Sequence, residues 1–116
     1  MLSSKHSLNR GEIALISRRG AVYQGRGLTI RVYKFAGLAN STRLAIVVST
    51  KVAKTATGRN LIKRRLRHIC RLLTKKLPAG YGIVLITRPD MLKQTFTEMK
   101  ATVEAIFKQA HLFLTD

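Results

Sequence analysis

The residues most capable of chemistry in this sequence are cations, not catalytic acids or metal ligands. The 116-residue chain carries 22 Lys and Arg but only five Asp and Glu, and no carboxylate lies between Glu12 and Asp90. The acids show no paired spacing for general acid–base work, and the three histidines form no helical metal motif with the single cysteine, Cys70. We therefore expect neither a catalytic residue nor a metal ligand in the protein itself.

The cations gather on one face of a predicted helix. From Arg59 to Lys76 the apolar residues recur with helical spacing, until the sequence LPAG ends the pattern. One arc of this helix holds Ile62, Leu66, Ile69, Cys70 and Leu73. The opposite arc holds Asn60, Lys63, Arg64, Arg67 and Arg71. Because Arg and Lys suit phosphate oxygens and few acids are available for i,i+4 pairs, this arc predicts binding to a nucleic-acid backbone; a solvated basic face is the alternative.

The composition agrees with a folded protein that binds a polyanion. A net charge of +17 and a pI of about 11.4 favour nucleic acid, and the lack of Trp argues against a membrane surface. Hydrophobic residues make up 46% of the chain, enough for a packed core. The sequence has no signal-peptide pattern and no run of about 20 apolar residues, so we expect a cytoplasmic protein. Cys70 is expected to be a buried core thiol.

A single α+β domain spanning residues 1–116 is predicted to position the basic arc. Residues 1–9 are polar and expected to be flexible. We predict a helix at 11–19, strands within 21–35 and at 43–50, the basic helix at 59–76, a strand at 81–89 and a helix at 94–114. This order favours a roughly four-stranded sheet covered by helices on one side, with a strand–helix–strand crossover that is right-handed by default.

The basic helix and its approach carry a family signature. The segment RLAIVVSTKVAKTATGRNLIKRRLR resembles the bacterial ribonuclease P protein, in which a buried strand and a Ser- and Lys-containing turn precede Arg-Asn-Arg and further basic residues. The matching positions are Ser49, Lys51, Arg59, Asn60, Lys63, Arg64 and Arg67. Leu61 stands where the family usually has Arg, and Gly58 and His68 also depart from the pattern. The resemblance extends more weakly to both ends of the chain.

The resemblance implies a fold and two RNA-binding surfaces. The fold would be like that of domain 2 of ribosomal protein S5, with a rare left-handed crossover. The residues expected to bind the catalytic RNA are Arg59, Asn60, Lys63, Arg64, Arg67 and Arg71. The residues expected to bind the 5′ leader of precursor tRNA are Ile13, Ser17, Arg31, Tyr33, Lys51 and Arg88. The family tends to stack bases on aromatics of its first helix and first long strand; here Tyr23, Tyr33 and Phe35 are either their replacements or ordinary core residues.

The resemblance also implies the activity and the partners. The chain would be the protein subunit of an endoribonuclease that removes the leader of precursor tRNA, with hydrolysis carried out by Mg²⁺ held mainly in the RNA subunit. Its partners would be ribonuclease P RNA and precursor tRNA, with no membrane and no need for a protein oligomer. A structural, ribosomal-type RNA-binding protein is the alternative. A DNA-binding regulator would need a helix-turn-helix partner upstream, where the sequence is strand-like.

Overall fold

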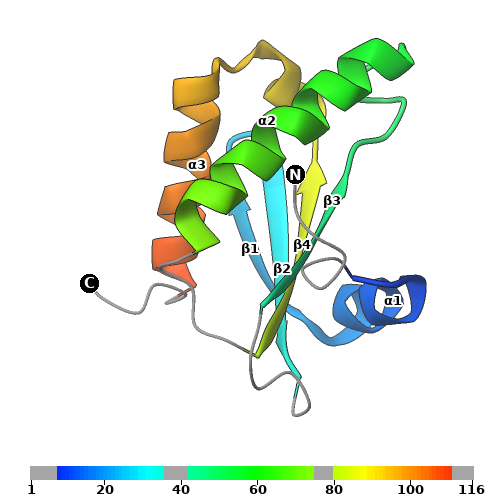
Figure 1. Ribbon diagram of the computed structural model, residues 1–116, viewed down its shortest axis with the longest axis vertical. Coiled ribbons are helices and arrows are strands. Elements are labelled where there is room, and N and C mark those ends of the chain that lie inside the picture. The colour runs from blue at the N-terminus through cyan, green and yellow to red at the C-terminus, as the bar shows by residue number, and fades with distance from the viewer. Residues whose placement is uncertain (1–7, 36–41, 75–79, 111–116) are drawn as a thin grey trace.

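The protein alternates helices and strands along the chain. The structure is a computed structural model that describes residues 8–35, 42–74 and 80–110. The elements in chain order are α1 (Arg10–Arg19), β1 (Ala21–Gly25), β2 (Leu28–Lys34), β3 (Arg43–Val47), α2 (Ala56–Thr74), β4 (Tyr81–Thr87), the 3₁₀ helix η2 (Pro89–Lys93) and α3 (Phe96–Gln109) (Figure 1). The predicted α+β class and the four-stranded sheet are confirmed.

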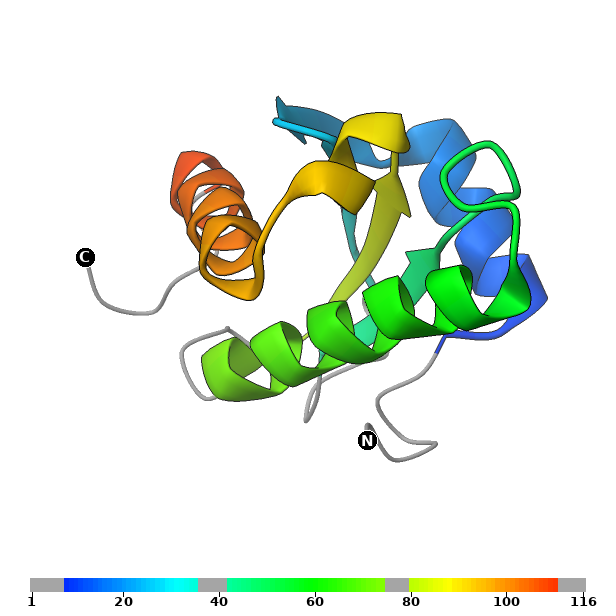
Figure 2. The ribbon, with the colours of Figure 1, turned by 90° about the horizontal axis from the view of Figure 1, so that it is seen from above.

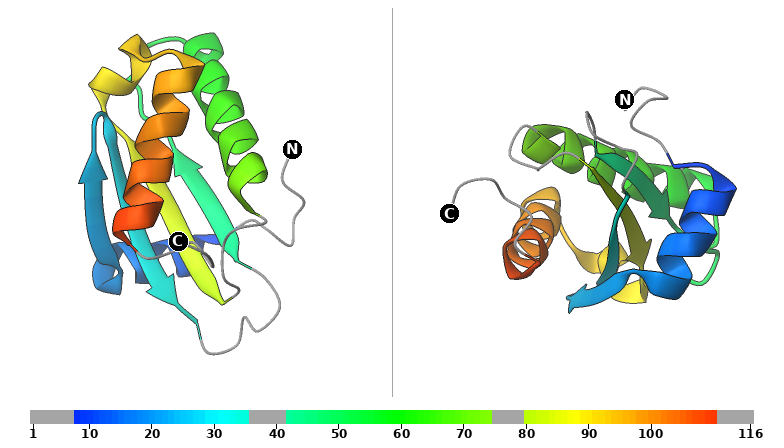
Figure 3. Two further views of the ribbon diagram at one scale, coloured as in Figure 1. Left: turned by 90° about the vertical axis from the view of Figure 1, so that its left-hand side faces the viewer. Right: turned by 90° about the horizontal axis from the view of Figure 1, so that it is seen from below.

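The four strands form one open sheet in the order β1-β2-β4-β3. The β1–β2 and β2–β4 pairs are antiparallel, and the β3–β4 pair is parallel. With α2 in front and both parallel strands pointing up, β3 lies to the right of β4, so the crossover is left-handed (Figures 1 and 3). The family expectation is confirmed and the general default fails here. A right-handed connection over the same face would require β3 on the edge of β4 that β2 occupies.

The core lies between the sheet and the pair α2 and α3 (Figure 2). The apolar arc predicted for the basic helix is buried as expected, Cys70 included. Strands β2, β3 and β4 contribute Leu28, Ile30, Val32, Leu44, Ile83 and Leu85. The α3 helix contributes Met99, Val103, Ile106 and Phe107, which all lie within the predicted helix range. Burial of the apolar arc of α2 turns its polar arc away from the sheet.

Helix α1 covers the other face of the sheet, so the expectation that all helices lie on one side was wrong. Gly82 pairs directly with Tyr33, and both therefore lie on the face opposite the core. A Cβ atom on Gly82 would come within 2.7 Å of the Ile16 Cδ1 atom and 2.5 Å of the Phe35 Cε2 atom. The missing side chain lets α1 approach the strand closely (Figure 3). Only Ile16 of α1 is fully buried, and so narrow an apolar stripe does not tell which face a helix will cover.

Helix α1 begins at Arg10, one residue before its predicted start. Residues 1–7 lie outside the described residues, but Leu8 and Asn9 are held in place, contrary to the expectation of a flexible segment up to residue 9. The Leu8 backbone N–H donates to the Leu44 carbonyl at 3.3 Å. Asn9 caps α1 through a reciprocal capping box with Glu12. The pattern Asn-x-x-Glu carries this signal in the sequence.

The boundaries of α2 and α3 also differ from the prediction. Helix α2 begins at Ala56, before Arg59, because the Thr55 hydroxyl accepts a hydrogen bond from the Gly58 backbone N–H at 3.0 Å. Its predicted last two residues fall outside the described residues.

The predicted last helix began two residues before α3 does, and the 3₁₀ helix ahead of it was not predicted. Pro89 opens a 3₁₀ turn, and α3 begins only after Thr95, which forms a capping box with Glu98. The hydrogen bonds from the Thr95 backbone and side chain lower the pKa of Glu98. The predicted end of this helix near residue 114 lies outside the described residues.

Candidate nucleic-acid interface

The polar arc of α2 is a row of unpaired cations. Asn60, Arg64 and Arg71 are exposed, and Lys63 and Arg67 are half-buried. In the parts of the chain that the structure describes, the ion pairs are Arg26–Glu98, Arg43–Glu12 and Lys100–Glu104. All three lie off α2, so none of the carboxylates in the described ranges pairs with this arc. We call the residues Asn60, Lys63, Arg64, Arg67 and Arg71 the basic face.

Arg59 differs from the other predicted RNA-binding residues because part of its guanidinium closes the loop before α2. Its Nη1 atom donates to the carbonyl oxygens of Ala53 and Lys54, each at 3.0 Å. The same loop is anchored by the buried side chains of Val52 and Ala53, while Lys51 is exposed. Arg59 therefore organises the turn that presents Lys51, and its half-buried side chain precedes the basic face along α2.

A second surface lies on the side of the sheet away from α2. Directly paired residues of a sheet share a face, which places Arg31 between Val22 on β1 and Val84 on β4. Val22 and Val47 are 46% and 39% exposed, unusually open for strand valines. The uncovered side chains of this surface, here called the open sheet face, are Val22, Gln24, Thr29, Arg31, Val47 and Ile86.

The open sheet face ends at α1. Tyr33 and Phe35 lie at this end, with ring centroids 5.0 Å apart and planes at 71°. On α1, Ile13 is half-buried and Ser17 is exposed, one helical turn apart beside the buried Ile16. The structure thus brings the predicted residues Ile13, Ser17, Arg31 and Tyr33 to one side of the sheet.

Three other predicted residues of the leader surface lie elsewhere or have other contacts. Tyr23 pairs with Ile30 and packs on the core side, so it cannot replace a stacking aromatic on the open sheet face. Lys51 belongs to the loop before α2. The Arg88 guanidinium donates to the carbonyl oxygens of Gly25 and Leu28, and this ties the end of β4 to the β1–β2 turn.

Glu12 is a positioning residue that the sequence analysis did not single out. One carboxylate oxygen accepts from the Asn9 backbone N–H at 3.0 Å, and the other lies 3.4 Å from Nη1 of Arg43 at the start of β3. The one acid in the first 89 residues therefore joins the start of α1 to the edge of the sheet. Its capping-box spacing was visible in the sequence, but its partner Arg43 was not.

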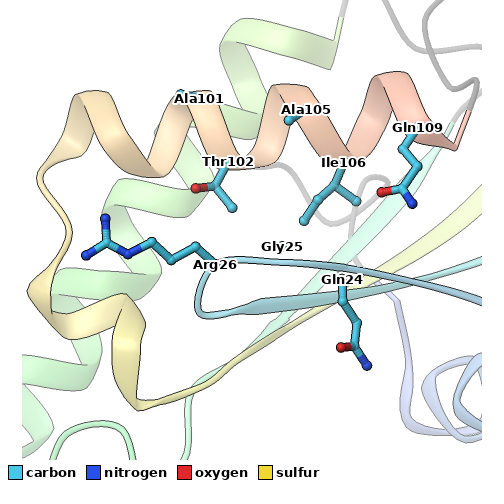
Figure 4. A pocket seen from close by; sticks show the side chains of 8 residues that line it. All are labelled: Gln24, Gly25, Arg26, Ala101, Thr102, Ala105, Ile106 and Gln109. Carbon is cyan, nitrogen blue, oxygen red and sulfur yellow. The ribbon is translucent and has the colours of Figure 1, made fainter.

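The groove between α3 and β1 has a different character. It encloses about 320 Å³ and is lined by Gln24, Gly25, Arg26, Ala101, Thr102, Ala105, Ile106 and Gln109 (Figure 4). Arg26 at one end is paired with Glu98, and Gln24 points away from the helix. The outer side of α3 also pairs Lys100 with Glu104. Balanced charge and small side chains give this region no particular attraction for RNA.

The described residues were compared with what a metal ion or a membrane-spanning helix requires. Among them, no three His, Cys, Asp or Glu side chains gather where they could hold a metal ion. No helix in the described ranges is long and apolar enough to cross a membrane.

The fold and these surfaces define a small α+β RNA-binding protein of the ribonucleoprotein type. A model of the family described as Ribonuclease P matches residues 2–111, and the chain belongs to this family. It is 34% identical over 111 residues to the ribonuclease P protein component of Pseudanabaena sp. (strain PCC 6903), covering 95% of each chain. It is 33% identical over 88 residues to that of Picosynechococcus sp., covering 76% of each.

Solved structures agree with this assignment. The ribonuclease P protein from Thermotoga maritima superposes with a TM-score of 0.79 at 28% identity, covering 89% of this chain and 96% of that one. The Staphylococcus aureus protein gives a TM-score of 0.83 at 23% identity, covering 91% and 94%, which shows the shared fold. The chain is thus a protein subunit of an endoribonuclease ribonucleoprotein whose partner is ribonuclease P RNA. A ribosomal-type structural protein is not favoured, and β3 precedes α2 where a helix-turn-helix regulator would need a helix.

Proposed function

We propose that the protein binds ribonuclease P RNA through the basic face of α2 and holds the 5′ leader of precursor tRNA on the open sheet face. The observation that carries the proposal is that the two surfaces lie on opposite sides of one sheet. A single small domain can therefore contact two RNA segments at once. Cleavage of the leader would then benefit from an increased effective concentration of substrate at the catalytic RNA.

The open sheet face suits a single-stranded RNA segment. Arg31 supplies a guanidinium for a phosphate oxygen, and Val22 and Val47 supply apolar surface beside it. Among the described side chains of this face, the aromatic rings for stacking lie at the end where Tyr33 and Phe35 meet. We expect the leader to be held mainly through its backbone, with little dependence on base identity along most of the face.

The chemistry of cleavage belongs, in this proposal, to Mg²⁺ held mainly by the RNA. The donor groups of the described residues do not fit a Mg²⁺ site, because no cluster of carboxylates is present among them. The protein would contribute by neutralising phosphates, which allows the folded RNA and its substrate to come together at lower Mg²⁺ concentrations. This work would take place in the cytoplasm, without a membrane and without a protein oligomer.

Reconstitution with ribonuclease P RNA tests the proposal. Precursor tRNAs with leaders of increasing length are cleaved at low and high Mg²⁺, with and without the protein. The protein should restore cleavage at low Mg²⁺ and should tighten substrate binding as the leader lengthens. Cleavage that the protein leaves unchanged at every Mg²⁺ concentration would disprove the proposal.

A structural RNA-binding role predicts a different pattern in the same experiment. The protein would then tighten the fold of the RNA and improve cleavage equally for substrates with long, short or absent leaders. An Arg31→Ala variant would behave like the wild type under that alternative, whereas the proposal requires it to lose part of the leader dependence.

A further inference from the structure

The C-terminal half of α2 carries a hollow that reaches beyond the positions of the family signature. It encloses about 340 Å³ and is lined by Arg64, Arg67, His68 and Arg71. Offsets of three, four and seven residues place these side chains on neighbouring positions over two helical turns, or about 10 Å. We call this feature the basic hollow.

The basic hollow is built for an anion. Three of its four lining side chains are guanidiniums, and the fourth is an imidazole. No carboxylate of the described residues pairs with any of them, because the acids that form ion pairs lie on α1 and α3. Several converging guanidiniums repel one another unless an anion lies between them. A phosphate accepts hydrogen bonds from Arg with matching fork geometry, which makes it the best-suited ligand.

His68 is held in place by a neighbour from another helix. Its exposed imidazole ring meets the ring of Phe96 edge to face, with centroids 5.4 Å apart and planes at 65°. Phe96 itself is packed against the core and is the first residue of α3, next to the Thr95 cap. A ring whose orientation is fixed before binding loses less rotational freedom when a ligand binds. Phe96 thus fixes one wall of the basic hollow.

We propose that the basic hollow binds one backbone phosphate of ribonuclease P RNA, with His68 as a direct ligand and Phe96 as the residue that positions it. The inference rests on the proposed binding of this RNA by α2 and adds two residues to that surface. Neither of them belongs to the signature, and His68 departs from it. The hollow continues the row of cations toward α3, so the docked RNA would run along α2 past Arg67.

Binding measurements on single variants test the inference. Arg71→Ala, His68→Ala and His68→Gln are compared with Lys108→Ala, which removes an exposed cation from α3. Dissociation constants are measured for ribonuclease P RNA alone and for precursor tRNA alone, over a range of salt. Arg71→Ala should weaken binding to ribonuclease P RNA about tenfold and reduce the log–log salt slope by about 0.7 to 0.9. His68→Ala should weaken it several-fold, and His68→Gln less, because an amide still donates a hydrogen bond.

Phe96 requires a test that separates positioning from stability. Phe96→Leu should weaken RNA binding in the wild-type background but not in the His68→Ala background. Phe96→Tyr keeps an aromatic ring against His68 and should bind RNA like the wild type. A purely structural role would make the two losses add. Thermal unfolding of each variant measures the folded fraction at the temperature of the binding measurements, and this fraction should match that of the wild type.

Each result has a defined meaning. If the variants of the basic hollow bind ribonuclease P RNA as tightly as Lys108→Ala does, this inference is overturned. The proposed function would still stand, since the wild type binds the RNA. A loss confined to precursor tRNA would also overturn it, because the phosphate would then come from the substrate. A wild-type chain that does not bind ribonuclease P RNA would overturn the proposed function as well.

Discussion

The basic face of α2 and the open sheet face are expected to bind RNA by different physics. The first is a row of cations on one continuous helix, and no carboxylate that the structure describes forms an ion pair with it. The second is assembled from all four strands of the sheet and carries one guanidinium, that of Arg31, among mostly aliphatic side chains. Binding at the first should depend steeply on salt, whereas binding at the second should depend on the length of RNA that covers it. The protein thus separates attachment to one RNA from contact with another.

The largest effect should follow from removing two charges from the basic face. The double variant Arg64→Ala/Arg67→Ala should bind ribonuclease P RNA about a hundredfold more weakly, because two charge-assisted contacts are lost. Its log–log salt slope should fall by about 1.4 to 1.8. Filter binding between low and moderate salt measures both. The matched control Lys100→Ala/Lys108→Ala removes two charges from α3 and should leave the slope nearly unchanged; an equal effect of the control would show that only net charge matters.

A smaller and more selective effect is expected on the open sheet face. Arg31→Ala should weaken binding of precursor tRNA with a long leader up to about tenfold, since one phosphate contact is removed. Mature tRNA and ribonuclease P RNA should bind as before. Competition binding with leaders of several lengths measures the difference, and Arg10→Ala on α1 serves as the exposed control. A loss that is equal with and without a leader would contradict the assignment of this face.

The link between α1 and the sheet should contribute about 1 to 2 kcal/mol to the free energy of unfolding. Glu12→Ala removes both the capping box and the pair with Arg43, which should lower the free energy of unfolding by about 1 to 2 kcal/mol. Glu12→Gln keeps a capping side chain and should cost less than about 1 kcal/mol. Urea unfolding measures both variants. Because the open sheet face ends at α1, Glu12→Ala should also weaken leader binding while binding to the basic face stays unchanged.

The smallest effect concerns the buried arc that supports the basic face. Burial raises the pKa of the Cys70 thiol from 9.0 to about 12. The unfolded chain therefore loses this proton at lower pH than the folded chain, and stability falls as the pH rises from 9 toward 12. Between pH 7 and 9 the loss should be only about 0.4 kcal/mol relative to Cys70→Ala. Thiol labelling of the native protein should be slow at pH 8, and rapid labelling would show that the apolar arc of α2 is not packed.

The basic face was predictable because a helix is local. Its residues recur within a single segment, so the spacing of Ile62, Leu66 and Ile69 was enough to separate the buried arc from the exposed one. The start at Ala56 was missed because the Thr55 cap depends on the loop geometry before the helix. The hydrogen bonds that Arg59 donates to the backbone carbonyls of this loop could not be predicted from the sequence either.

The open sheet face was less predictable because its neighbours are far apart in the chain. The alternation of residues along β2 places Arg31 and Tyr33 on the side opposite Leu28 and Ile30, and this much is local. It could not say that Val22 and Val47 would share that side with Arg31, since this depends on the strand order and register. Tyr23 lies on the core side because of the register between β1 and β2. Arg88 binds the β1–β2 turn because the end of β4 lies beside that turn in the folded sheet.

The sequence by itself determined the α+β class of the protein, the polyanionic character of its partner and the two arcs of α2. Composition and helical periodicity were enough for this, because they need only local information. The tertiary structure decided on which side of the sheet α1 lies, and with it where an open surface remains. That decision rests on the space above Gly82, which Ile16 and Phe35 fill, and on the pair that Glu12 forms with Arg43. Such contacts join residues tens of positions apart, so no pattern within one segment can encode them.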